Sequence, residues 1–197
     1  MKLMTYQYSD GDIDLHYDFI FVQRCPELFA KCIEDWDIVG DMIWNECYDS
    51  HGICTIQTST QHKVEKHDFT DFIEPADKTQ GKSYHILYLP DNGLRVISAS
   101  ITYPQTPDLM PIYDSQVQEV LSLIDDNTVI VGDFHNEQDY EGLVNHAKYQ
   151  QSFKKEDGSK LCLQQIITTD ISKVNIENIR CAWQEGYGHS PLEFEIN

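Results

Sequence analysis

The sequence is poor in positive charge. Its 197 residues contain 14 Lys and Arg against 33 Asp and Glu, which gives a formal net charge of −19. Proteins that bind nucleic acids usually gather cations, because neutralising the phosphates supplies much of their affinity. A strongly negative molecule instead repels a polyanion at long range. The charge balance therefore disfavours long nucleic acids as ligands and makes a basic protein the better expectation for a partner.

Long hydrophobic runs are missing as well. No stretch reaches the roughly 18 consecutive apolar residues that a membrane-spanning helix needs. The first ten residues hold one Lys and no apolar core, which is unlike a secretory signal. The six cysteines form no CxxC pair, as expected for reduced and mostly buried thiols. We therefore expect a cytoplasmic protein without a membrane partner.

The material for a folded core is present. Hydrophobic residues make up 41% of the chain, enough for one domain over residues 1–197. Apolar residues at helical spacing predict helices after Pro26, over 111–124 and over 137–150, and Asp91-Asn92-Gly93 predicts a hairpin turn. Short apolar or alternating segments predict strands at 2–8, 19–22, 52–58, 83–89, 94–103, 128–131, 161–168, 179–183 and 192–196. This mixture predicts a layered α+β domain with a β-sandwich core.

Six segments, taken in their order along the chain, are similar to the motifs of one protein family. They are MKLMTYQY (1–8), DFIFVQR (18–24), VISASITYPQ (96–105), VIVGDFHN (129–136), LCLQQIITT (161–169) and YGHSPLEFEI (187–196). The set resembles the endonuclease/exonuclease/phosphatase (DNase I-like) family, and the GDF triplet is its most specific part. The resemblance implies a four-layered α/β sandwich in which helices flank two packed mixed sheets. It also implies hydrolysis of phosphoesters with Mg²⁺ or Mn²⁺.

The resemblance assigns active-centre positions, and only two of them keep the family's residue. Asp133 matches the Asp of an Asp-x-Asn pair that orients the attacking water, and His189 matches a His that assists at the phosphate. His135 stands where the Asn of that pair belongs, with Asn136 one place further on. The other positions carry replacements: Gln7 for an Asn, Arg24 for the metal-binding Glu, Gln164 for an Asp, and Gly188 for the Asp that orients the His.

These replacements weaken the expected metal site. Hard cations bind anionic oxygens, and the changes at positions 24 and 164 remove two carboxylates. Arg24 also places a positive charge at the expected cation position. At ~4 Å and an effective dielectric of ~20, the interaction of one pair of unit charges is worth ~4 kcal/mol, so Arg24 would repel the cation. We therefore expect no metal cofactor, with Mg²⁺ or Mn²⁺ needed only if the chain is active. We also predict that Arg24 takes the cation's place and bonds Asp133.

Three functions remain open from the sequence. The first is a catalytically degenerate module that binds or regulates a protein partner, of basic character, through an acidic surface. The second is an active metal-dependent phosphodiesterase or phosphatase with rearranged ligands and a small substrate. The third is a structural or assembly protein that makes no use of the old active centre.

Histidines add one more alternative. Asp133, His135 and His189 could together form a softer site for Zn²⁺, Mn²⁺ or Ni²⁺, since imidazole and carboxylate suit such ions. The remaining histidines share no helical or strand register, so we expect them at the surface. They are His16, His51, His62, His67, His85 and His146.

Overall fold

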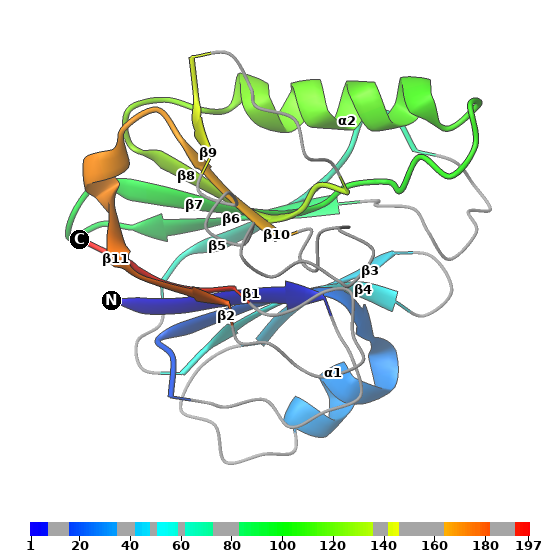
Figure 1. Cartoon of the computed structure of the whole chain (residues 1–197). Helices are drawn as coiled ribbons and strands as arrows, with labels where there is room; N and C mark the ends of the chain where they lie inside the picture. The colour runs from blue at the N-terminus through cyan, green and yellow to red at the C-terminus, as the bar shows by residue number, and fades with distance from the viewer. Residues whose placement is uncertain are drawn as a thin grey trace, which may run out of the picture.

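The computed structural model describes residues 1–7, 16–34, 42–47, 51–58, 62–72, 83–135, 142–145, 164–181 and 192–197. Two β-sheets pack face to face, and each carries a helix on its outer side (Figure 1). This arrangement confirms the predicted α/β sandwich of two mixed sheets flanked by helices. Neither described helix has the length and hydropathy needed to cross a bilayer.

The first sheet brings the two ends of the chain side by side. Its strand order is β11-β12-β1-β2-β4-β3, with β1 and β2 parallel and the other neighbours antiparallel. The Met1 amino group donates to the Ile196 carbonyl over 3.2 Å. The strands are β1 (Lys2–Gln7), β2 (Phe19–Pro26), β3 (Met42–Cys47), β4 (His51–Gln57), β11 (Val174–Cys181) and β12 (Leu192–Ile196).

The second sheet repeats this pattern of pairing. Its order is β5-β6-β7-β8-β10-β9, with the parallel pair, β7 and β8, again in the middle. The remaining pairs are antiparallel. The strands are β5 (Val64–Asp68), β6 (Ser83–Leu89), β7 (Leu94–Ser100), β8 (Thr128–Asp133), β9 (Val144–Asn145) and β10 (Gln164–Thr168). A 3₁₀ turn, η2 (Ile171–Lys173), precedes β11.

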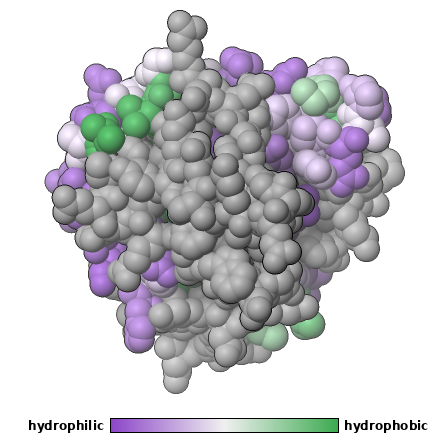
Figure 2. All heavy atoms as spheres, in the orientation of Figure 1, coloured by the Kyte–Doolittle hydropathy of each residue, from purple (hydrophilic) through white to green (hydrophobic). Residues whose placement is uncertain are grey.

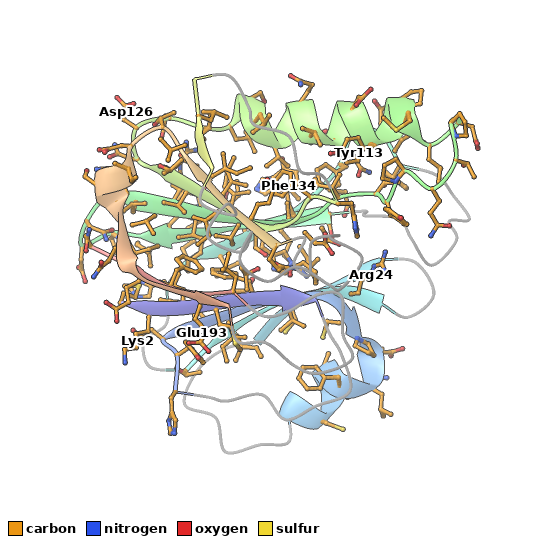
Figure 3. All side chains as sticks on the ribbon, in the orientation of Figure 1. Lys2, Arg24, Tyr113, Asp126, Phe134 and Glu193 are labelled. Atoms are coloured by element: carbon orange, nitrogen blue, oxygen red, sulfur yellow. The ribbon has the colours of Figure 1, made fainter. Side chains whose placement is uncertain are left out.

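The alternation of side chains along β8 shows how the layers form. Val129 and Val131 join the apolar cluster that fills the space between the sheets. Ile130 and Phe134 point the other way, into the cluster beneath helix α2 (Met110–Ser122), where Figure 3 shows Phe134 near Tyr113. Helix α1 (Glu27–Glu34) covers the outer face of the first sheet in the same manner. Each sheet therefore has one face in the interior of the sandwich and a helix packed on part of its other face.

Most predicted elements are confirmed. The four strands that the motif order places in the interior are β1, β2, β7 and β8, and each has a neighbour on both sides. The turn at Asp91-Asn92-Gly93 joins β6 to β7, and Gly93 adopts a φ of 66°, which favours glycine. The helices expected after Pro26 and over 111–124 are α1 and α2.

Other predictions are wrong. The helix expected over 137–150 is contradicted at Val144–Asn145. These residues form a two-residue strand, because they pair with Ile167 and Thr168. Apart from 142–145, that range lies outside the described residues. His85 is 1% exposed, not at the surface. Strands β3 and β5 were not foreseen. β5 reads VEKHD and lies at a sheet edge, so it lacks the apolar alternation that would reveal a strand.

Candidate functional site

The described positions of the predicted active centre lie where the two parallel strand pairs end. Asp133 is the last residue of β8, and its register partners are Ser100 on β7 and Gln164 on β10. Directly opposite residues on neighbouring strands project to the same face. Since Asp133 follows Val129 and Val131 on that face, these three polar side chains continue the row that lies between the sheets. Asp133 and Gln164 are 1% and 0% exposed.

The surroundings of Gly132 explain why a glycine precedes Asp133. Its φ is 140°, and a Cβ built there would lie 1.9 Å from the Ala99 carbonyl oxygen on β7. A side chain cannot be accommodated at that distance, so the motif requires glycine for steric as well as conformational reasons. The close approach lets β7 and β8 run together up to Asp133, whose carbonyl accepts from the Ile101 N–H over 3.1 Å.

His135 pairs with Asp133 across a tight turn. Its backbone has a φ of 47°, its N–H donates to Asp133 Oδ1 over 3.1 Å, and its ring Nδ1 lies 3.2 Å from the same oxygen. The two side chains are 2% and 1% exposed. The Tyr103 ring packs against the imidazole at 4.9 Å between centroids. A carboxylate that holds an imidazole can orient it for proton transfer, but burial separates this pair from solvent.

Arg24 occupies an irregular place in the first sheet. It has a φ of 51° and lies where the register between β2 and β4 shifts between Val22 and Cys25. Figure 3 shows Arg24 at the end of β2, beside β3 and β4. A register shift of this kind arises when one strand holds an extra residue, and it changes the direction in which the neighbouring side chains point. Among the described residues, His135 Nδ1 lies 3.2 Å from Asp133 Oδ1. The Arg24–Asp133 bond stays a prediction.

Neutral side chains join the two sheets beside Asp133. The Thr5 hydroxyl on β1 donates to Gln164 Oε1 over 2.9 Å. Gln23 Nε2 on β2 lies within 3.0 Å of Thr5 Oγ1 and 3.3 Å of Ser98 Oγ on β7. All four residues are at most 1% exposed. Amides and hydroxyls thus fill the end of the sandwich near the position where the resemblance implies charged metal ligands.

The described donors do not fit a hard divalent cation. Mg²⁺ and Mn²⁺ sites are built from anionic oxygens, usually carboxylates. Here Asp133 is accompanied by neutral Gln164 and Ser100 in its own row. No group of three or more His, Cys, Asp or Glu with metal-binding geometry occurs among the residues described.

Some predicted positions lie beyond the described part of the chain. Asn136, Gly188 and His189 belong to undescribed segments, as does the side chain of Gln7, whose backbone pairs with Gln23. The softer metal site that includes His189 therefore stays a prediction.

Sequence reasoning missed the neutral network itself. Its signal was present: Thr5 follows Leu3, and Gln23 follows Phe19 and Phe21, at the two-residue spacing of one strand face. A polar residue that continues a row of buried apolar side chains on one strand face needs a hydrogen-bond partner in the interior. Such a residue marks the boundary between the apolar core and a polar site.

Comparison with solved structures identifies the fold. No protein-family model matches the sequence, and no curated protein matches it. An endonuclease/exonuclease/phosphatase family protein from Leptotrichia buccalis superposes with a TM-score of 0.68 at 13% identity, covering 100% of this chain and 99% of that one. TDP2 from D. rerio in complex with a single-strand DNA product gives 0.64 at 9% identity, with the same coverage. The 3'-5' exonuclease NExo from Neisseria meningitidis gives 0.61 at 11% identity and covers 100% of both chains. The chain therefore has the fold of the endonuclease/exonuclease/phosphatase family.

Proposed function

We propose that this chain is a non-hydrolytic member of the phosphoesterase fold that binds or regulates a protein partner. The observation that carries the proposal is the burial of its former active centre. Asp133 and Gln164 are 1% and 0% exposed, and the His135 side chain that pairs with Asp133 is 2% exposed. A phosphoester must reach the attacking water and the charges that stabilise its transition state. Side chains sealed inside the sandwich offer it neither.

The chemistry of the replacements supports the same conclusion. A divalent cation neutralises charge on the reacting phosphate, and it needs anionic oxygens to hold it. Gln164 is a neutral amide, and its Oε1 is engaged by Thr5. Arg24 adds a positive charge at the end of β2. The function is therefore better sought on the surface than in this centre.

The net charge suggests the character of the partner. A charge of −19 on 197 residues creates a field that attracts basic surfaces and speeds their association. Figure 2 shows hydrophilic residues around the rim of one face of the molecule. We therefore propose a basic protein as the partner rather than a long nucleic acid.

A hydrolysis assay tests the proposal. Purified protein is incubated with single- and double-stranded DNA, RNA and a small chromogenic phosphodiester, each with Mg²⁺, Mn²⁺ or Zn²⁺. We expect rates equal to those of Asp133→Ala for every substrate. Turnover above that variant with any of these metals would contradict the proposal.

The same assay examines the second candidate, an active phosphodiesterase with rearranged ligands. The observation that favours it is the Asp133–His135 pair, in which a carboxylate lies 3.2 Å from an imidazole nitrogen. Such pairs supply general bases in many enzymes. If the candidate is right, turnover should fall by at least about a hundredfold in both Asp133→Ala and His135→Ala.

A further inference from the structure

The two sheets are connected by buried side-chain hydrogen bonds as well as by apolar packing. Three strands of the first sheet each contribute one bond to a strand of the second. In every case both side chains are at most 1% exposed. The bonds are Thr5–Gln164 at 2.9 Å, Gln23–Ser98 at 3.3 Å and Thr55–His85 at 2.9 Å.

The strand registers place these bonds in one band across the sandwich. In the first sheet Phe21 lies opposite both Thr5 and Thr55. In the second sheet His85 lies opposite Ser98. The bonds thus run from β1 to β10, from β2 to β7 and from β4 to β6. The band lies at the edge of the apolar cluster, on the side of the former active centre.

We propose that this band is a polar clasp that holds the two sheets together and is released when His85 gains a proton. The polar clasp comprises Thr5, Gln23, Thr55, His85, Ser98 and Gln164. It does not depend on whether the chain hydrolyses phosphoesters, because it concerns the joining of the sheets.

His85 is the clasp residue that can change its charge. Its Nδ1 faces Thr55 Oγ1, and its Nε2 is buried with no hydrogen-bond partner in the described structure. A neutral imidazole tolerates one such nitrogen, whereas an imidazolium has two donors and a charge to satisfy. Burying an unpaired charge is among the costliest changes in a core. Protonation therefore favours separation of the sheets.

The groups around His85 add to this preference for the neutral form. Lys66, its register partner on β5, is cationic, and His67 follows on the same strand. Thr55 on β4 and Ser98 on β7 carry no charge. Burial first, and then the charges of Lys66 and His67, lower the pKa of His85 from 6.5 to about 3.

The sign of the pH effect follows from that shift. Between about pH 6.5 and about pH 3 the unfolded chain binds a proton at His85 and the folded chain does not. Acid therefore favours the unfolded state, and the contribution of His85 to stability is lost as the pH falls through this window. At pH 4.5 the unfolding constant should be raised about a hundredfold by this one group, relative to pH 8.

Unfolding by urea at several pH values between 8 and 4.5 tests this linkage. Wild type is compared with His85→Gln, which keeps a hydrogen-bonding side chain without titrating, and with His16→Gln, which removes an exposed histidine. We expect most of the hundredfold change to disappear in His85→Gln and to persist in His16→Gln. Equal pH profiles for wild type and His85→Gln would overturn the role of His85.

A matched serine pair tests the clasp without touching His85, in case His85→Gln does not fold. Ser98 and Ser83 are both 1% exposed, but Ser98 Oγ is bonded to Gln23, while Ser83 Oγ has no hydrogen-bond partner among the described residues. Ser98→Ala should raise the unfolding constant about three- to tenfold at neutral pH, and Ser83→Ala should leave it nearly unchanged. Equal effects of the two substitutions would show that the bonds between the sheets contribute nothing, and would refute the clasp.

Discussion

At the scale of single residues, backbone geometry explains the residues next to Asp133 better than side-chain chemistry does. Gly132 is fixed by its contact with the Ala99 carbonyl, and His135 has a φ of 47° that few non-glycine residues adopt. In the Asp133–His135 turn the backbone N–H of one residue donates to the carboxylate of the other over 3.1 Å. An aspartate that bonds the N–H two residues on is a common way to stabilise such turns. Asp133 thus has a structural role that does not require a metal.

Gly132→Ala tests the steric part of this account. The added methyl would meet the Ala99 carbonyl oxygen at 1.9 Å, so β7 and β8 would have to separate. We expect a loss of roughly 3 kcal/mol or more in the free energy of unfolding, measured with urea. Gly93→Ala is the control, because Gly93 also has a positive φ of 66° but has open space around its Cβ. It should cost only about 1 kcal/mol. Similar losses in both variants would show that conformation alone, not the close approach, requires Gly132.

At the scale of elements, helix α2 fixes the segment that leads to the site. Gln116 is fully buried on the inner face of the helix. Its Oε1 accepts from the Thr102 N–H over 2.8 Å, and its Nε2 donates to the Asp71 carbonyl over 2.9 Å. Thr102 is followed by Tyr103, which packs on His135. One glutamine therefore connects α2 to two loops and, through Tyr103, to the turn that holds Asp133.

Gln116→Leu should destabilise the protein by about 1–3 kcal/mol. Leucine has a similar volume, but it removes the acceptor of one buried backbone N–H and the donor to one carbonyl. The control is Gln118→Leu, an exposed position on the same helix, which should change stability by less than about 0.5 kcal/mol. Urea unfolding midpoints give both values. A neutral Gln116→Leu would mean that packing, not these two bonds, holds the loops to α2.

The elements also show what the sequence could and could not predict. The interior strands β1, β2, β7 and β8 carry apolar runs and ordered motifs, so their existence and place were predictable. β9 has two residues and depends on its pairing with β10, which no local pattern reveals. His85 was misassigned to the surface, although it follows the alternation of Leu87 and Leu89 toward the core. A polar residue in an apolar register was the signal, as it was for Thr5 and Gln23.

At the scale of the whole molecule, the sequence predicts the fold more completely than it predicts the site. The order of six segments was enough to predict a two-sheet sandwich that solved structures match at TM-scores of 0.61 to 0.68. The arrangement of the site was less predictable, because hydrogen bonds between the sheets depend on three-dimensional register.

The most direct test of this account is a titration of the full chain with Mn²⁺, followed by electron paramagnetic resonance, for wild type and Asp133→Asn. A charge of −19 attracts cations weakly over the whole surface, so the variant separates that background from a specific site. We predict that the two proteins bind Mn²⁺ equally, without saturation at one ion per chain. Stoichiometric binding of one Mn²⁺ by the wild type that is lost in Asp133→Asn would contradict the account.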